Sequence, residues 1–217
     1  MTYTKFMKQE NLINGEWVHA DNGKSFNVSN PATGEIIGSV PASGYDETQK
    51  AIAAASAAFP SYSTKPLLER VGLLWKLHDA LMDNQKSLAE LLTIEQGKSI
   101  TEATGEIIIG AAYIRWFAEE IRRNKGEIVP ASAPDRRILV TKHPVGVVGM
   151  ITPWNFPSSM LARKLGPALA AGCTVVAKPA SATPYSGLAW GALCEEVGFP
   201  KGVVNILTGS AREIGDA

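Results

Sequence analysis

The amino-acid sequence predicts an α/β fold, in which a partial parallel sheet with helices on both faces follows short strands, several helices and an extended arm. Apolar residues recur at helical spacing between residues 46 and 124, whereas from residue 145 onwards short valine- and isoleucine-rich segments alternate with helical ones. This alternation, with nearly continuous apolar strands, is typical of a parallel sheet covered on both faces. The changes of pattern divide the chain into residues 1–126, 127–144 and 145–217.

The first region should begin with short strands and continue into helices that pack on the sheet. Strands are predicted between residues 11 and 41, where the turn DNGK separates LINGEWV from SFNVSNPATGEII. The first helix is expected to begin at Asp46, because Asp46 and Gln49 have the spacing of a capping box.

Three more helices are predicted after the first. Apolar residues at three- and four-residue spacing place them at about residues 66–83, 85–96 and 99–124. The second of these should stop at Gly97 and the third near Gly126, because glycine commonly follows the last turn of a helix. The third should bury a stripe of small and branched residues, namely Ile107, Ala111, Ile114 and Ala118.

The other two regions are predicted to be an arm and a sheet. Within residues 127–144, EIVP and RRILVTKHP are expected to form a hairpin or extended arm. The rest should form strands at 145–151, 174–177 and 203–207, with helices at 158–171 and 184–197 and a helix start at 211. A doubly wound sheet usually has five or six strands. We therefore expect an unfinished sheet with an uncovered edge and an apolar face.

Composition limits the function classes. The 217 residues are 45% hydrophobic and carry 21 basic and 21 acidic side chains, a balance that favours neither nucleic acid nor an anionic membrane as partner. No apolar run approaches the roughly 18 residues that span a bilayer, and the N-terminus has no signal-peptide pattern. Cys173 and Cys194 have no metal-ligand spacing, so buried structural thiols and no metal site are expected. A soluble cytoplasmic protein is the default expectation.

Two polar side chains follow neighbouring strands of the predicted sheet. ITPWNFP ends the first strand and places Asn155 between two prolines, and Lys178 directly follows TVVA. Sequential parallel strands are usually neighbours about 4.8 Å apart, and open α/β sheets bind ligands at the carboxyl ends of their strands. We therefore expect Asn155 and Lys178 to face one crevice. The sequence is equally compatible with Asn155 bonding loop backbone groups and Lys178 reaching solvent. No G-x-G-x-x-G turn supports a standard dinucleotide loop.

Longer motifs add a family resemblance. ITPWNFP, LGPALAAGCTVVAKPASATP and VNILTG, together with the early NGEW, NPATGE and ERVGLLWKLHDAL segments, closely resemble the aldehyde dehydrogenase superfamily, most of all its succinate-semialdehyde branch. The resemblance covers nearly the whole chain. It implies an aldehyde-dehydrogenase-like fold with a Rossmann-type sheet, an NADP or NAD cofactor, a small aldehyde substrate, and homo-oligomers that use the arm at residues 127–144.

The resemblance also implies roles for matching residues. Asn155 matches the amide that stabilises the oxyanion of a thiohemiacetal intermediate, a contribution of about 2.7–4 kcal/mol for one preorganised donor. The flanking prolines would hold its loop rigid. The remaining residues of the two strand ends match the cofactor site, with Lys178 on the adenosine ribose; they are Thr152, Pro153, Trp154, Pro179, Ala180 and Ser181.

Ser181 bears on the choice of cofactor. Family members that prefer NAD often carry glutamate at the matching position, where a carboxylate would repel a 2′-phosphate. Serine removes this repulsion, and Lys178 is close enough in sequence to pair with phosphate. NADP preference, or use of both cofactors, is therefore expected.

Arg163 is a candidate for substrate binding. It lies eight residues after Asn155 and off the buried stripe of its predicted helix, which by itself favours a solvated surface arginine. In the succinate-semialdehyde branch, the matching arginine binds the distal carboxylate of the substrate, for which a planar guanidinium is suited.

Other polar residues give weaker signals. His19, His78 and His143 are scattered, and Glu102 with Glu106 should be solvated on one helical face. The family's G-Q-x-C nucleophile and E-L-G-G base motifs do not occur, so these residues alone should not oxidise aldehydes. The alternatives are a noncatalytic nucleotide-binding or interaction fragment and an unrelated hydrolase, although the latter's G-x-S-x-G elbow is absent.

Overall fold

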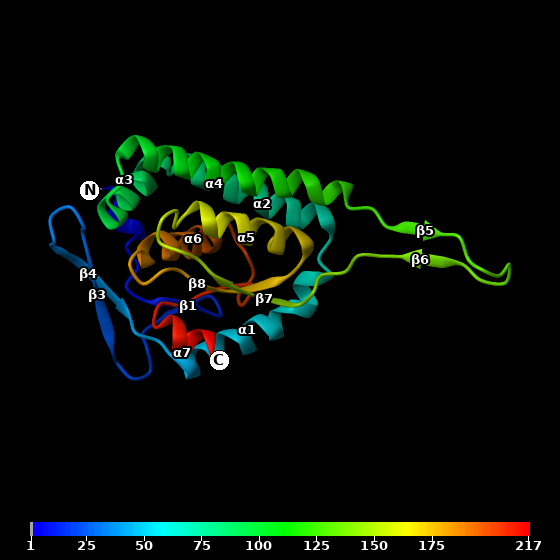
Figure 1. Cartoon of the computed structure of the whole chain (residues 1–217), viewed down its shortest axis with the longest axis horizontal. Coiled ribbons are helices and arrows are strands. Elements are labelled where there is room, and N and C mark those ends of the chain that lie inside the picture. Colours follow the sequence, from blue (N-terminus) through cyan, green and yellow to red (C-terminus); the bar gives the residue numbers. More distant parts are fainter. Residues whose placement is uncertain (1) are drawn as a thin grey trace.

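The computed structural model describes residues 2–217 and arranges them in four layers (Figure 1). One face of the central sheet is covered by α1 (Tyr45–Ser63) and the short α7 (Ala211–Gly215), and the other by α5 (Ser159–Ala171) and α6 (Pro184–Glu196). An outer helical layer lies over α5 and α6 and consists of α2 (Leu67–Asp83), α3 (Gln85–Gln96) and α4 (Ile100–Glu120). The predicted α/β class with helices on both faces is confirmed.

The central sheet has five strands in the order β2-β1-β9-β8-β7. Its parallel part consists of β7 (Val147–Ile151), β8 (Thr174–Lys178) and β9 (Val204–Ile206), as predicted. The sheet does not stop at these three strands, because β1 (Asn11–Ile13) pairs antiparallel with β9 through Leu12 and Ile206, and β2 (Glu16–Val18) pairs with β1. Strand–helix alternation could not reveal the pairing of β1 with β9, since the two strands are almost the whole chain apart. The other edge is open as expected, since β7 is the last strand of the sheet and pairs with β8 alone among residues 2–217.

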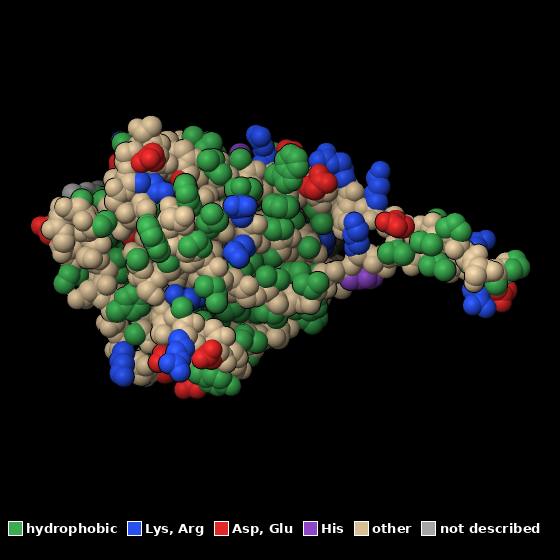
Figure 2. All heavy atoms as spheres, viewed as in Figure 1, with side chains coloured by type: hydrophobic (Ala, Val, Ile, Leu, Met, Phe, Trp, Pro, Cys, Tyr) green, Lys and Arg blue, Asp and Glu red, His purple; other side chains and the backbone are tan. Residues whose placement is uncertain are grey.

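Two further hairpins lie outside the central sheet. β3 (Ser25–Ser29) pairs with β4 (Ile36–Pro41), and β5 (Glu127–Val129) pairs with β6 (Ile138–Val140) in the predicted arm. The arm projects far from the body of the molecule and carries apolar side chains on its surface (Figures 1 and 2). Ile128 is 82% exposed and Leu139 is 67% exposed.

The helix boundaries follow the sequence signals with two corrections. The N-cap of α1 is Gly44, and Glu47 accepts a hydrogen bond from the Gly44 N–H at 2.9 Å, so the expected box of Asp46 with Gln49 is wrong. A glutamate at the third helical position reaches back to the N-cap, and that position belongs to Glu47 once the helix begins at Tyr45. α4 ends at Glu120 and continues as a 3₁₀ turn, η2 (Ile121–Arg123), short of Gly126. Another 3₁₀ turn, η1 (Thr2–Phe6), precedes β1.

The core lies on both sides of the sheet, and its larger part is shared with the outer helical layer. The four residues of the predicted α4 stripe are buried, and so are both cysteines, which are free thiols. Small residues bring α4 against the start of α5: a Cβ added at Gly110 would lie 3.7 Å from Ala162 Cβ and 3.9 Å from Ser159 Cα. This close approach lets α4 side chains reach the start of α5. Within residues 2–217, no helix combines the length and apolar character that crossing a membrane requires.

Candidate functional site

The carboxyl ends of β7 and β8 lie side by side. Ile151 and Lys178 are register partners, and the Thr152 N–H donates to the Lys178 carbonyl at 3.2 Å. The loops that carry the predicted site residues therefore begin from adjacent points on the sheet edge. This confirms the expected convergence of the strand ends, while a shared nucleotide pocket for the Asn155 amide and the Lys178 ammonium stays a prediction.

Lys178 is buried and bonded within the site. Its Nζ donates to the Pro179 carbonyl at 2.9 Å and to Ser181 Oγ at 3.3 Å, and Ser181 Oγ donates to the Gly209 carbonyl at 3.0 Å. Burial lowers the pKa of the Lys178 ammonium. The alternative in which Lys178 extends into solvent is excluded by its burial. The hydrogen bond between Lys178 Nζ and Ser181 Oγ places a cation and a hydroxyl side by side.

Cavities open beside both members of this pair. Lys178 borders a cavity of about 390 Å³ between the sheet, α1 and α7, which Thr48, Ile151, Val176 and Ile214 also line. Ser181 borders a second cavity of about 290 Å³, together with Trp154 and Thr183. The hydrogen-bonded pair thus lies between two cavities, one beside each of its members.

The β7 loop presents polar groups without protein partners. Thr152 is buried, and its Oγ1 has no hydrogen-bond partner among residues 2–217. Trp154 and Asn155 are exposed, and the Asn155 side-chain amide makes no hydrogen bond to any described residue. The alternative in which Asn155 bonds loop backbone groups is therefore not observed. Its amide is free to meet an oxygen outside the chain.

A lysine of the outer helical layer contacts the backbone of Asn155. The Asn155 carbonyl accepts a hydrogen bond from Lys98 Nζ at 3.0 Å, and the same ammonium pairs with Glu106 Oε2 at 2.6 Å. The other carboxylate oxygen of Glu106 accepts the N–H groups of Ser158 and Ser159 at 2.9 and 3.0 Å. The expectation that Glu106 is solvated is wrong: a helix N-terminus and an ammonium ion compensate its burial.

A second buried carboxylate occupies the matching place at α6. Glu95 accepts the backbone N–H groups of Tyr185 and Ser186 as well as the Ser186 hydroxyl, the last at 2.6 Å. Burial raises the pKa of Glu95 to about 7, although these hydrogen bonds oppose the shift. Glu95 was not among the predicted residues. Its sequence signal was an acidic residue on the buried stripe of a helix, in step with Leu88, Leu91 and Leu92.

Arg163 is exposed on α5, away from the buried Leu161 and Leu165. Its guanidinium lies 5.5 Å from the centre of the Tyr113 ring and approaches Met160 Sδ at 3.8 Å. No carboxylate within residues 2–217 forms an ion pair with it. Its predicted position off the buried stripe is confirmed, and its charge is available to an external anion.

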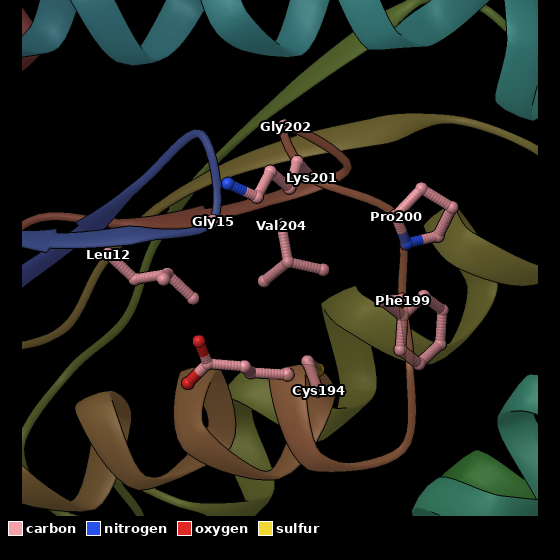
Figure 3. Close-up of a pocket in the computed structure, with 9 residues that line it drawn as sticks. Leu12, Gly15, Cys194, Phe199, Pro200, Lys201, Gly202 and Val204 are labelled. Atoms are coloured by element: carbon pink, nitrogen blue, oxygen red, sulfur yellow. The ribbon is translucent and has the colours of Figure 1, made fainter.

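A small, mostly apolar cavity lies away from the carboxyl ends of the strands. It has a volume of about 110 Å³ and lies between the β1–β2 turn, the end of α6 and the segment that leads into β9 (Figure 3). Leu12, Cys194, Phe199 and Val204 make it largely apolar. It opens beside the amino end of β9, whereas open α/β sheets bind ligands at the carboxyl ends, so it is not the candidate site.

The strand ends, their order and the motifs on them match one known family. Residues 17–217 match the family model described as the aldehyde dehydrogenase family. The chain belongs to this family. It is 53% identical over 211 residues to a glutarate-semialdehyde dehydrogenase of Pseudomonas aeruginosa, and 49% identical over 213 residues to an NADP(+) succinate-semialdehyde dehydrogenase of Escherichia coli. These alignments cover 97% and 98% of the chain.

Solved structures of family members have the same fold. A crystal structure of an E. coli NADP-dependent enzyme superposes with a TM-score of 0.97 at 49% identity and covers 98% of the chain. The chain spans 44% of the length of each of these three proteins. The predicted resemblance to semialdehyde dehydrogenases and the aldehyde-dehydrogenase-like fold are thus confirmed, and the chain corresponds to the N-terminal part of such an enzyme.

Proposed function

We propose that these residues form the adenosine side of the cofactor site of an NAD(P)-dependent aldehyde dehydrogenase, with NADP preferred or used alongside NAD. The observation that carries the proposal is the hydrogen-bonded pair of Lys178 and Ser181 at the carboxyl edge of the sheet. An ammonium and a hydroxyl suit ribose hydroxyls or a 2′-phosphate, and Ser181 brings no repelling carboxylate. The unpartnered Thr152 hydroxyl and the adjoining cavities fit a polar ligand.

The residues of the two strand ends would hold the cofactor and orient the aldehyde. Pro153 and Trp154 after β7, and Pro179 and Ala180 after β8, would line the nucleotide. The exposed Asn155 amide would donate to the oxygen that becomes negative when a nucleophile adds to the aldehyde. The cofactor, when bound, supplies a nicotinamide ring that accepts hydride.

The proposed substrate is a short aldehyde with a distal carboxylate, of the succinate-semialdehyde type. The two relatives described above are named for glutarate and succinate semialdehydes, both of which end in a carboxylate. Arg163 would bind that carboxylate, because its guanidinium is exposed and unpaired by any described acidic residue. A planar guanidinium donates two parallel hydrogen bonds to a carboxylate.

The three regions of the chain would have different roles. Residues 145–217 would bind the cofactor, residues 1–126 would pack on that region, and the arm at 127–144 would pair with another subunit of a homo-oligomer. The exposed apolar residues of the arm support this last role, because such surfaces mark interaction sites. We place the enzyme in the cytoplasm.

A second candidate is a noncatalytic nucleotide-binding or interaction fragment. It is favoured by the lack of G-Q-x-C and E-L-G-G motifs in these 217 residues. The first candidate requires nucleotide binding at Lys178, and so does the nucleotide-binding form of the second. The two candidates differ in aldehyde oxidation, which needs a cysteine nucleophile from outside these residues.

The cofactor proposal is tested by titrating the chain with 2′,5′-ADP and 5′-AMP, which report on the adenosine side alone. We expect tighter binding of 2′,5′-ADP by the parent, and Ser181→Glu should reverse the order, because a carboxylate repels the 2′-phosphate. Lys178→Met should weaken both ligands. Binding of NAD at least tenfold tighter than NADP would contradict the interpretation of Ser181.

A further inference from the structure

Lys98 lies at the meeting point of the outer helical layer and the β7 loop. It follows the left-handed Gly97, which ends α3, and precedes Ser99, which caps α4. Its side chain is 10% exposed, and that of Glu106 is 1% exposed. The ion pair is therefore withdrawn from solvent although one member belongs to a loop between helices.

Three kinds of contact connect this pair to the loop around Asn155. Lys98 Nζ donates to the Asn155 carbonyl, and the same ammonium lies 4.2 Å from the centre of the Phe156 ring. Glu106 accepts the N–H groups of Ser158 and Ser159. The loop is thus held at Asn155, at the next residue and at the start of α5, while the Asn155 side-chain amide is left free.

The hydrogen bond from Lys98 to the Asn155 carbonyl is not needed to compensate the buried charge of Glu106. A buried carboxylate needs hydrogen bonds and a counter-charge, and Glu106 has both without the Asn155 carbonyl. The direct bond from Lys98 to Asn155 adds nothing to the compensation of Glu106. Its effect is on the backbone of the residue that presents the amide, where a displacement of about 1 Å can cost 10²-fold in rate.

We propose that Lys98 and Glu106 are positioning residues, which fix the Asn155 backbone so that its side-chain amide is aimed before the substrate binds. The inference rests on the proposed oxyanion role of Asn155. Lys98 acts on the loop directly, whereas Glu106 acts by orienting Lys98 and by capping α5. Neither side chain touches the aldehyde.

The pair can be tested in the chain itself with Lys98→Met, Glu106→Gln and the double variant. Either single change leaves a buried group without its partner, so both should lower the melting temperature. The double change removes both charges and should recover most of that loss.

The order of the loop is a separate measurement. The backbone ¹⁵N order parameters at 154–156 should fall from about 0.85 to below about 0.6 in Lys98→Met and in the double variant, even though the double variant regains stability. Lys50→Met, which breaks the exposed pair with Asp21, is the matched control and should leave them unchanged.

Turnover in the full-length dehydrogenase separates positioning from stability. We expect kcat to fall at least tenfold in the double variant with the aldehyde KM changed less than twofold, and Lys98→Arg should restore part of the loss. In an Asn155→Ala background, Lys98→Met should have little further effect, because the amide it positions is gone. If loop order and kcat recover with stability in the double variant, the pair is only structural and the inference is wrong. If Asn155→Ala alone leaves kcat unchanged, the oxyanion role itself is wrong.

Discussion

The start of α5 and the start of α6 have the same arrangement with one difference. Each helix follows a sheet strand, and each receives a buried glutamate from the outer helical layer, Glu106 at α5 and Glu95 at α6. Glu106 also pairs with Lys98, whereas the partners of Glu95 are neutral donors. At the start of α5 the capping glutamate, Glu106, is therefore part of an ion pair. At the start of α6 the capping glutamate, Glu95, has no counter-ion among the described residues, and its pKa is raised to about 7.

The difference shows how the surroundings of a capping carboxylate decide what it can do. Where an ammonium group lies beside it, the carboxylate can anchor a loop through that ammonium, as Glu106 does through Lys98. Where only dipoles are present, burial competes with the hydrogen bonds, and the group titrates near neutral pH. The loop of Asn155 has the carboxylate with a counter-ion.

The largest expected loss of stability comes from breaking the ion pair of Lys98 with Glu106. Glu106→Ala removes the partner of a largely buried ammonium and leaves the Ser158 and Ser159 N–H groups unbonded. We expect the free energy of unfolding to fall by about 3–5 kcal/mol. Urea denaturation of the chain measures this. A loss below 1 kcal/mol would show that solvent compensates the site and that the two helix starts are more alike than their contacts indicate.

The second prediction concerns the pH dependence that Glu95 confers. Its pKa in the folded chain, about 7, lies above its ordinary value of 4.5, so between these values the native state binds more protons than the unfolded state. The contribution of Glu95 to stability is therefore complete below about pH 4.5 and is lost as the pH rises through about 7. Relative to Glu95→Gln, the parent should lose stability across this window, by about 3 kcal/mol at most.

A matched change sharpens this prediction. The hydrogen bond from the Ser186 hydroxyl lowers the pKa of Glu95, so Ser186→Ala, which keeps the backbone N–H bond, should move the upper end of the window to higher pH. Unfolding free energies measured from pH 4 to pH 8 decide both points. A difference between the parent and Glu95→Gln that does not vary with pH would show that Glu95 keeps one protonation state.

The smallest effects come from the hydroxyl residues at the two N-caps. Neither Ser158 nor Thr183 caps its helix with its side chain, because the glutamates bind the helical N–H groups. Ser158 Oγ instead accepts from Trp190 Nε1 at 3.0 Å, whereas Thr183 Oγ1 is buried with no partner within residues 2–217.

Ser158→Ala should therefore cost about 1–3 kcal/mol by leaving the indole N–H unbonded, and Thr183→Val should be neutral or slightly stabilising. Thermal unfolding of both variants provides the measurement. A loss near 1 kcal/mol for Thr183→Val, typical of a removed N-cap, would mean that its hydroxyl does cap α6.

Most elements of the fold could be predicted because their signals are local. Apolar spacing located α2, α3 and the buried stripe of α4, and the alternation after residue 145 located three strands and the helices between them. The side-by-side strand ends followed from the rule that sequential parallel strands are neighbours. The boundaries that differed, at the start of α1 and the end of α4, depend on capping bonds that several neighbouring residues could make.

What the sequence alone determined is the order of elements, the positions of Asn155 and Lys178 at two strand ends, and the family that their motifs indicate. Only the tertiary structure decided that β1 closes the edge of β9, that Lys178 turns inward to Ser181, and that Glu95 and Glu106 are buried at helix starts. The reason is that a charged side chain is predicted to be solvated until its partners are known, and the helix N–H groups that bind Glu106 and Glu95 lie 52 to 91 residues away in the chain.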